Sequence, residues 1–262
     1  MGATQAQILQ DPATAFNCFH PDDLQALIAV NDAARTTLQP FHWQGRVPRP
    51  DGMRWLRMES TPALQANGDV VWSGTQYDIT ARRQMQDQVR QLAFYDSLTT
   101  LANRRLFNDR LAQALLTGKR SGGYCALLFL DLDNFKPLND AHGHEAGDLL
   151  LIEVAQRMKA CVREVDTVGR FGGDEFVVLL SELTPDRATS TAEAARVAEK
   201  IRSALEQPYR LGLVEHRCSA SIGVAIIDAS QTTAEQAVHS ADKAMYDAKS
   251  HGRNQVWLSQ AV

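Results

Sequence analysis

The two most apolar stretches of the chain each carry acidic residues at one end. In ALLFLDLD, residues 126–133, five apolar residues precede Asp131. In RFGGDEFVVLL, residues 170–180, Asp174 and Glu175 stand directly ahead of the apolar run FVVLL. A strand buried on both faces rarely tolerates a carboxylate, so these acids belong at strand ends, where ligands collect in open α/β sheets. The chain is therefore expected to fold around a sheet with acids gathered at one end.

A glycine pair lets the second stretch form a hairpin. Gly172 and Gly173 suit a tight turn because glycine reaches positive φ without strain. Side chains alternate along a strand, so Asp133 faces the same side as Asp131. If the hairpin lies beside the first strand, carboxylates of both converge, and a hard cation such as Mg²⁺ is the usual remedy for their repulsion. The alternative is an acidic turn left in solvent.

The second half of the chain alternates helical and extended patterns. Helices are predicted over 106–118, 147–162, 192–205 and 234–250, and a further strand over 218–227. This mixture predicts an α+β domain in which helices pack against a sheet.

The first part of the chain predicts a small sheet module. A helical pattern over 21–34 precedes three extended segments, 41–46, 53–60 and 70–77, which the turn signals PRPDG and QANGD separate. The side chains of Trp43, Trp55 and Trp72 are expected to fill its core rather than to line a ligand pocket.

A polar helix is predicted between the two parts, over 80–95. Thr80 is a suitable N-cap for it. Met85, Val89 and Leu92 form a stripe too narrow to cover a core, which favours a short coiled-coil seam between two chains. The alternative is a surface helix that lies along one domain.

Charge and cysteine usage exclude several classes of protein. A net charge of −4 argues against a general nucleic-acid or anionic-membrane surface. No stretch reaches the length of a spanning helix, and the first residues lack the features of a cleavable signal. The cysteines have no metal-like spacing, and Cys125 lies in an apolar run that indicates a core position. A reducing cytoplasm is the expected compartment.

Five ordered motifs resemble the GGDEF domain from Asp96 to Trp257. They are GGDEF itself, DSLTTLANRR at 96–105 with Thr100 where glycine is more usual, DLDNFKPLNDAHGHEAGD at 131–148, SASIGVA at 219–225 and YDAKSHGRN at 246–254. The resemblance implies a diguanylate cyclase, which condenses two GTP into cyclic di-GMP and releases two pyrophosphates. It also implies a mainly antiparallel sheet flanked by helices, similar to the palm of nucleotide polymerases.

The front of the chain resembles the later part of a PAS domain. HPDD at 20–23, RPDGMRW at 49–55 and GTQYDIT at 74–80 carry this resemblance, whereas the first two PAS strands have no counterpart. The expected organisation is a partial PAS-like module at 1–79, a signalling or coiled-coil helix at 80–95 and a GGDEF domain at 96–262.

The resemblance assigns the acids to metal binding and catalysis. Asp131, Asp174 and the carbonyl of Leu132 would hold Mg²⁺, with Mn²⁺ as a substitute. Asp174 or Glu175 would assist deprotonation of a ribose 3′-hydroxyl, and the sequence does not decide between them.

The resemblance also assigns the substrate-binding residues. They are Phe135, Lys136, Asn139, Asp148, Gly172, Gly173, Lys249 and Arg253. Lys249 and Arg253, expected one helical turn apart, would neutralise phosphate charge; the alternative is that they complement the helix dipole. Asn139 and Asp148 match the guanine-reading pair, although Asp148 could equally be a helix N-cap.

A second nucleotide site is implied away from the first. REVD, residues 163–166, resembles the product-inhibition site of the family, in which Arg163 and Asp166 bind cyclic di-GMP, and Lys200 stands where a second basic contact occurs. The alternative is an exposed ion pair on a loop. His142 and His144 have no third ligand in view and are expected to be structural.

An active cyclase of this kind would work as a homodimer, because each domain holds one GTP. The alternative function is a catalytically silent GGDEF domain that serves as a receptor for cyclic di-GMP or GTP.

Overall fold

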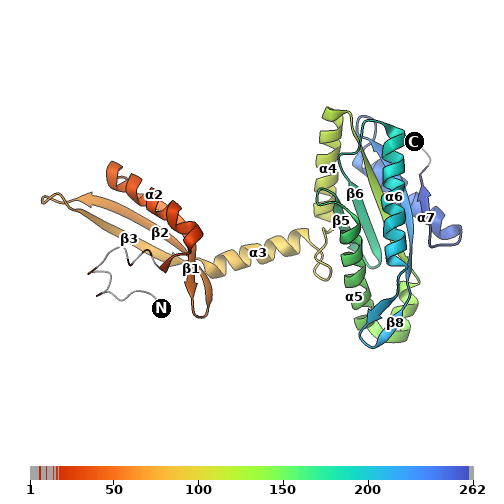
Figure 1. Cartoon of the computed structure of the whole chain (residues 1–262), viewed down its shortest axis with the longest axis horizontal. Helices are drawn as coiled ribbons and strands as arrows, with labels where there is room; N and C mark the ends of the chain where they lie inside the picture. The colour runs from red at the N-terminus through yellow and green to blue at the C-terminus, as the bar shows by residue number, and fades with distance from the viewer. Residues whose placement is uncertain (1–5, 7–9, 11–13, 15, 17, 260–262) are drawn as a thin grey trace. The chain divides into compact units, whose positions relative to one another are not determined.

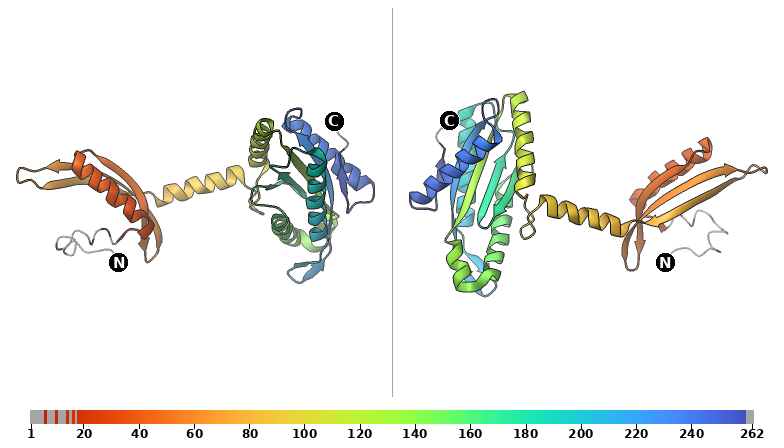
Figure 2. Two further views of the ribbon diagram at one scale, coloured as in Figure 1. Left: turned by 45° about the horizontal axis from the view of Figure 1, so that its top comes forward. Right: turned by 180° about the vertical axis from the view of Figure 1, so that it is seen from behind.

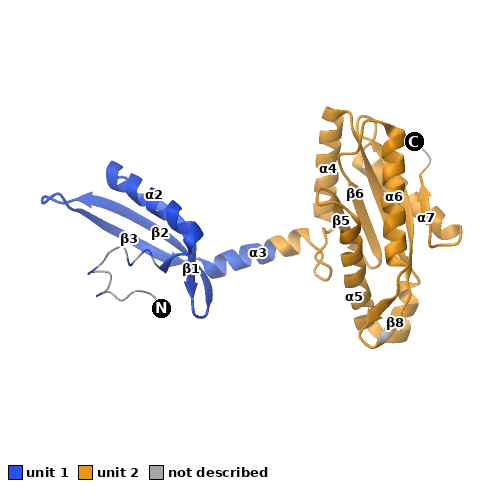
Figure 3. Cartoon of the chain, in the orientation of Figure 1, with its two compact units in different colours: residues 1–89 blue, residues 90–262 orange. Residues whose placement is uncertain are grey.

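The computed structural model describes residues 6, 10, 14, 16 and 18–259. The chain divides into two compact units, residues 1–89 and 90–262 (Figure 3). The border between them lies inside helix α3 (Thr80–Phe94) and so within the predicted linker segment. No helix among the described residues is long and apolar enough to cross a bilayer.

In the first unit a helix packs beside a three-stranded antiparallel sheet, as the sequence predicts. Helix α2 (Pro21–Thr37) is followed by β1 (Phe41–Arg49), β2 (Gly52–Leu64) and β3 (Val70–Asp78), with strand order β1-β2-β3. Trp43 is buried in the core of this unit and meets the ring of Phe19 edge-on at 5.2 Å. Trp72 is partly buried and meets Phe41 in the same way. These two tryptophans therefore fill the core.

Helix α3 begins at Thr80, but the prediction that Thr80 is its N-cap is wrong. The Thr80 hydroxyl accepts a hydrogen bond from the backbone N–H of Trp55 at 2.8 Å, which ties the helix to β2. The carboxylate of Asp78 accepts the N–H of Thr80 instead. The local pattern assigned the Thr80 hydroxyl to the cap, but the backbone of Trp55, distant in sequence, binds it instead.

The second unit is built around a five-stranded sheet of order β10-β9-β4-β6-β5 (Figure 1). Its elements in chain order are α4 (Arg104–Ser121), β4 (Tyr124–Asp133), α5 (Phe135–Cys161), β5 (Thr167–Gly172), β6 (Glu175–Leu180), α6 (Arg187–Leu205), β7 (Tyr209–Leu211), β8 (Val214–His216), β9 (Ser219–Asp228), α7 (Ala234–Ser250) and β10 (Val256–Leu258). Only the β10–β9 pair among these ladders is parallel. The predicted α+β class is confirmed.

Helices cover both faces of this sheet, and the alternation of side chains along β4 explains why (Figure 2). Leu128 and Leu130 belong to a core cluster with α5 and α6, whereas Leu127 and Phe129 belong to a second cluster with α4 and α7. Cys125 is buried in that second cluster as predicted, and burial raises the pKa of its thiol to about 12. Because both faces are covered, β4 can expose polar groups only at its ends.

The start of α5 and the position of Arg253 differ from the predictions. Helix α5 starts at Phe135, with a break at Gly143 (φ 81°, ψ 167°), so Asp148 lies within the helix and is not its N-cap. Helix α7 ends at Ser250, so Arg253 is not one helical turn beyond Lys249 on the same helix. Arg253 lies in the following turn with φ 62°.

Candidate functional site

The acids of the two apolar strands meet at one end of the sheet. Strands β4 and β6 are antiparallel, and their register sets Asp131 directly opposite Glu175. Side chains opposite each other in neighbouring strands point to the same face, here the face that α7 covers. Asp174 lies in the turn before Glu175, and its carbonyl oxygen accepts the N–H of Leu132 at 3.3 Å. The predicted convergence of carboxylates is therefore a feature of the fold.

Asp131 is a buried carboxylate, and Lys249 is the cationic side chain in contact with it among the described residues. The Nζ of Lys249 lies 2.7 Å from its Oδ2. Burial raises the pKa of Asp131, the bond from Lys249 lowers it, and the charge of Asp174 raises it again, with a net upward shift. The site therefore holds more negative charge than Lys249 offsets, which is an environment suited to an added cation.

The glycine turn is held in place by an arginine that the sequence analysis did not single out. Gly172 and Gly173 have φ of 140° and 53°, which side-chain-bearing residues rarely adopt. Arg170 donates from Nε and Nη2 to the carbonyl oxygen of Gly173 at 3.0 and 2.8 Å. It also donates from Nη1 to both carboxylate oxygens of Asp96, at 3.0 and 3.2 Å. The turn that carries Asp174 is thus bound to the first residues of the second unit.

Asp96 is kept ionised by the same contacts. Burial alone would raise its pKa, but hydrogen bonds from Thr99 and Arg170 outweigh burial and lower it. The ion pair is largely shielded from water, and the single nitrogen Nη1 of Arg170 serves both carboxylate oxygens in a charge-assisted contact.

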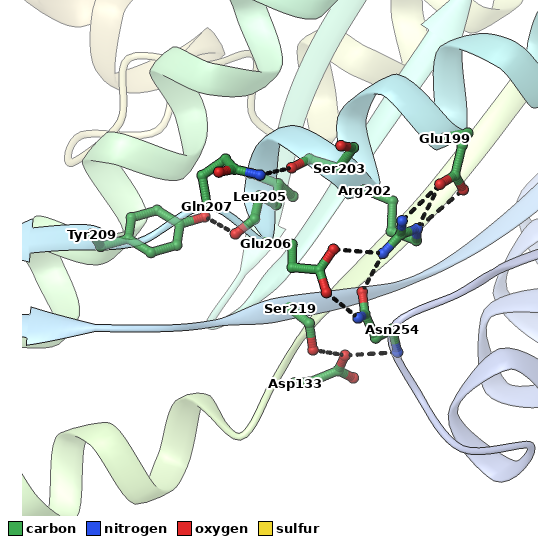
Figure 4. A network of polar contacts seen from close by, with 10 residues as sticks. All are labelled: Asp133, Glu199, Arg202, Ser203, Leu205, Glu206, Gln207, Tyr209, Ser219 and Asn254. Atoms are coloured by element: carbon green, nitrogen blue, oxygen red, sulfur yellow. Dashed lines mark hydrogen bonds and ion pairs between the residues drawn. The ribbon is translucent and has the colours of Figure 1, made fainter.

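Asp133 faces the same side as Asp131 but has a different environment. Its two carboxylate oxygens accept bonds from Ser219 Oγ at 2.6 Å and the backbone N–H of Asn254 at 3.1 Å (Figure 4), and from Ser221 Oγ at 2.8 Å. A carboxylate with three donors has little capacity left for a ligand. Asp133 therefore fastens the end of β4 to β9 and to the turn after α7.

The predicted base-recognition residues lie on the first part of α5. The Oδ1 of Asn139 is buried and has no hydrogen-bond partner among the described residues. A Cβ on Gly147 would lie 2.0 Å from that oxygen and 3.3 Å from the ring of Phe135, so only glycine fits there. Asp148 and Lys136 are exposed. An unsatisfied buried acceptor calls for an explanation, and a donor on a ligand supplies one.

The predicted inhibitory residues lie at the opposite end of the sheet. The carboxylate of Asp166 accepts the backbone N–H groups of Arg163 and Ser181, at 2.9 and 3.2 Å. The Nε of Arg163 lies 3.4 Å from Asp166 Oδ2. Lys200 donates from Nζ to the carbonyl oxygens of Cys161 and Ala160 at the end of α5, at 3.0 and 3.5 Å. These three residues are neighbours of one another and are remote from Asp131.

Several residues of the site were missed from sequence, and their signals differ. Arg170 stands two residues before the glycine pair, and Asp96 opens the quoted motif DSLTTLANRR, so both were visible without an assigned role. Arg202 on α6 contacts Asn254 at 2.7 Å, a pairing across 52 positions that no local pattern announces.

Fold and site together define an α+β domain in which acidic and basic side chains gather at one end of a sheet, beside a buried, unsatisfied amide. A family model described as "Diguanylate cyclase, GGDEF domain" matches residues 93–255, well over half of the chain. The chain belongs to the diguanylate cyclase GGDEF-domain family.

Curated relatives show the same domain in proteins of differing activity. The chain is 49% identical over 164 residues to the bifunctional diguanylate cyclase/cyclic di-GMP phosphodiesterase MucR of Pseudomonas aeruginosa, a match that covers 63% of this chain and 23% of MucR. It is 39% identical over 180 residues to the diguanylate cyclase TpbB of the same species, over 67% of this chain and 40% of TpbB. It is 38% identical over 186 residues to the cyclic di-GMP phosphodiesterase PdeR of Escherichia coli, over 71% and 27%. The chain thus spans between about a quarter and two fifths of the length of these relatives.

Solved structures agree with the fold of the second unit. The GGDEF domain of TpbB from P. aeruginosa superposes with a TM-score of 0.60 at 40% identity, over 63% of this chain and 94% of that one. The coiled coil and GGDEF domain of DgcB from Caulobacter crescentus, in complex with cyclic di-GMP, gives a TM-score of 0.61 at 28% identity, over 69% and 93%.

Proposed function

We propose that the chain is a diguanylate cyclase that condenses two GTP into cyclic di-GMP. The observation that carries the proposal is the site at the strand ends: Asp131 and Glu175 face each other across β4 and β6, with Asp174 in the turn beside them and Lys249 in contact. In each half-reaction a ribose 3′-oxygen forms a bond to the α-phosphorus of the other GTP. The bond from that phosphorus to the β-phosphate oxygen breaks, and pyrophosphate leaves.

The donor set fits a hard divalent cation. Asp131, Asp174 and the carbonyl of Leu132 offer only oxygen, the ligand type that Mg²⁺ and Mn²⁺ prefer. No group of three or more His, Cys, Asp and Glu side chains in the described part of the chain could hold a metal by itself. Substrate phosphates and water would complete the coordination, as is usual for Mg²⁺. When bound, the cation would offset charge on the triphosphate and lower the pKa of the attacking hydroxyl.

The remaining roles follow from position and charge. Asp174 or Glu175 accepts the proton of the 3′-hydroxyl. Asn139 and Asp148 read guanine, whose N1–H and N2–H₂ edge offers donors that adenine lacks, and the unpartnered Oδ1 of Asn139 accepts one of them. The ring of Phe135 lies beside Gly147, next to the Asn139 side chain.

Basic side chains and backbone grip the phosphates. Lys249 exchanges its bond with Asp131 for phosphate when GTP binds, and Arg253 and Lys136 add two further cations. Gly172 and Gly173 carry no side chain, so the backbone of the turn can approach the triphosphate closely.

Dimerisation is part of the proposal, because the product needs two GTP in opposed domains. The stripe on α3 supports it: Met85, Val89 and Leu92 are 65%, 61% and 73% exposed, and their spacing of four and three suits a coiled-coil seam. The front unit is proposed to be a partial PAS-like module whose output passes through this helix. Arg163, Asp166 and Lys200 would bind cyclic di-GMP as a feedback inhibitor.

The test is turnover by the purified chain. With GTP and Mg²⁺ we expect cyclic di-GMP and two equivalents of pyrophosphate, and with ATP no product. Asp174→Ala should reduce turnover by at least about 1,000-fold, because it removes a metal ligand that positions and neutralises the reacting phosphates. The absence of product from folded, dimeric wild type would refute the proposal.

The second candidate is a catalytically silent receptor, and the match to PdeR, named a phosphodiesterase, favours it. Tight binding of cyclic di-GMP or GTP without turnover would support the receptor function. Arg163→Ala should then abolish cyclic di-GMP binding and leave GTP binding intact.

A further inference from the structure

The turn after α7 holds three successive residues in an unusual backbone conformation. Gly252, Arg253 and Asn254 have φ of 114°, 62° and 47°. Glycine tolerates such angles and asparagine does so fairly well, but an arginine is strained in the left-handed region. Such a conformation persists only where the surroundings impose it.

Asn254 is fixed at both ends of its side chain (Figure 4). Its Oδ1 accepts from Nη1 of Arg202 at 2.7 Å, and its Nδ2 donates to Oε1 of Glu206 at 2.9 Å. Its backbone N–H donates to Oδ2 of Asp133 at 3.1 Å. The side chain therefore reaches α6, while the backbone is bound to the end of β4.

Arg202 and Glu206 form a rigid support on α6. Nη1 of Arg202 also donates to Oε2 of Glu206 at 3.1 Å, so these two residues and Asn254 close a ring of three contacts. Hydrogen bonds from Asn254 and Arg202 lower the pKa of Glu206, which keeps it ionised and an acceptor. Glu199 binds Nε and Nη2 of Arg202, at 2.7 to 3.0 Å, on the side of the guanidinium away from the Nη1 that contacts Asn254.

The other end of the network is Asp133, whose backbone lies two residues after Asp131. Ser219 and Ser221 hold its carboxylate, so the bond to Asn254 joins the turn to a fixed point of the sheet. The turn is therefore bound to α6 on one side and to β4 on the other. Arg253 lies in this turn, between the end of α7 and Asn254.

We propose that Asn254, held by Arg202 and Glu206, is a positioning residue that fixes Arg253 beside Asp131 and Lys249 for the triphosphate of GTP. The proposal rests on the proposed function, because it takes the nucleotide site to lie at this end of the sheet. A cation held in place before the phosphate arrives loses less conformational freedom on binding, which strengthens binding and orients the reacting phosphate. Asn254 itself need not touch the nucleotide.

The experiment measures affinity for GTPαS with Mg²⁺ by calorimetry, together with turnover of GTP. Asn254→Ala should weaken affinity about tenfold and raise KM more than it lowers kcat. The decisive readout is a double-mutant cycle: in the Arg253→Ala background, Asn254→Ala should change affinity less than twofold, because the residue that it positions is already gone.

Neighbouring variants separate positioning from stability. Glu206→Ala should weaken affinity about as much as Asn254→Ala, whereas Glu206→Gln, which keeps an oxygen for Asn254 Nδ2, should restore most of it. Asn254→Gly should fall between wild type and Asn254→Ala, because it keeps the left-handed backbone and loses both side-chain bonds. Glu199→Ala is the matched control, since it contacts Arg202 from the other side, and it should bind GTPαS as wild type does.

The inference about Asn254 and the proposed cyclase function fail on different outcomes. Additive effects in the cycle, or wild-type affinity in a folded but less heat-stable Asn254→Ala, would make the network purely structural. A wild type that binds GTPαS but yields no product refutes the cyclase function and leaves the affinity cycle as a valid test of Asn254. A wild type that does not bind GTPαS refutes both.

Discussion

The two units of the chain both place helices on an antiparallel sheet, but they use their acidic residues in opposite ways. In the first unit, Asp23 joins α2 to β1 through three hydrogen bonds with Arg46, an ion pair at the edge of a small core. In the second unit, Asp131 is buried at the end of a strand where burial and Asp174 raise its pKa. The ionised Asp23 stabilises the fold, because its pKa is lowered. The ionised Asp131 destabilises the fold, because burial and Asp174 raise its pKa, and a bound cation would relieve this.

The difference follows from how much of each sheet is covered. Strand β4 is buried along almost its whole length between two helical layers, whereas β2 is mostly half-buried or exposed with one helix beside it. Polar groups buried between two layers interact strongly because little water screens them. The sheet covered on both faces can therefore hold strongly interacting charges at a strand end. The half-covered sheet leaves its polar groups in water, which weakens their interactions.

Apart from the loss of activity expected for Asp174→Ala, the largest predicted effect tests the arginine that holds the glycine turn. Arg170→Ala should lower GTP turnover about 100-fold, because the turn carrying Asp174 loses its two bonds at the Gly173 carbonyl and small displacements of reacting groups have effects of that size. The measurement is steady-state production of cyclic di-GMP. Arg104→Ala, which removes a guanidinium stacked on neighbouring Phe171, is the control and should keep activity within about threefold. Equal losses in both variants would show that the clamp has no special role.

The next prediction tests whether the two units fold independently. Trp43→Ala should destabilise the first unit by about 3–5 kcal/mol, the range for removing a large buried aromatic side chain. Calorimetry should show an early or missing transition for that unit, while the transition of the second unit stays in place. Trp72→Ala, at a partly buried position, should cost less. A parallel downward shift of both transitions would contradict the division into two units.

The seam on α3 should have a smaller effect, and one that depends on concentration. The triple variant Met85→Ser, Val89→Ser and Leu92→Ser should raise the protein concentration for half-maximal turnover about tenfold and leave the melting of the second unit unchanged. The matched control is Gln84→Ser, Gln88→Ser and Gln91→Ser, exposed positions with the same spacing one residue earlier. A seam between chains predicts a difference between the two variants; a helix that acts as a simple connector predicts none.

Much of the second unit could be predicted because its information is local. The apolar runs of β4 and β6, the glycine pair between β5 and β6, and the acids beside them are contiguous in the sequence, and alternation along a strand fixes which face each acid takes. The helix of the first unit and its three strands were equally readable from turn signals.

The errors and omissions share a different cause. Thr80 has the right residue type for a cap, but the backbone of Trp55, 25 positions away, takes its hydroxyl. Arg202 and Asn254 meet across 52 positions, so their contact depends on how the turn between α7 and β10 reaches α6. The end of α7 at Ser250 was predicted correctly, but the expectation that Arg253 lies one helical turn beyond Lys249 was an avoidable error, because Gly252 is the residue type that commonly follows a helix and marks its end.

The smallest predicted effect returns to the acid of the first unit. The hydrogen bond from the Arg46 side chain lowers the pKa of Asp23 to about 2, from an ordinary value of 3.8. A carboxylate whose pKa is lower in the folded state contributes stability that is complete above the unfolded pKa and is lost as pH falls through the folded pKa. Asp23→Asn should therefore lower the melting temperature of the first unit at pH 7, and the gap to wild type should close between about pH 4 and pH 2.

The neighbouring acid provides the control for that experiment. Asp22 contacts the same arginine once, at 3.2 Å, and its side chain is 70% exposed, so Asp22→Asn should shift the melting temperature much less.

In metal-free buffer Asp131→Asn should show the reverse behaviour in the second unit. We expect a gain in stability at neutral pH that disappears as the pH falls toward 3.8, because the raised pKa of Asp131 means that its ionised form destabilises the folded state. If Asp131→Asn instead lost stability at neutral pH, as Asp23→Asn is expected to do, the carboxylate of Asp131 would form a structural ion pair with Lys249 rather than a site for a ligand.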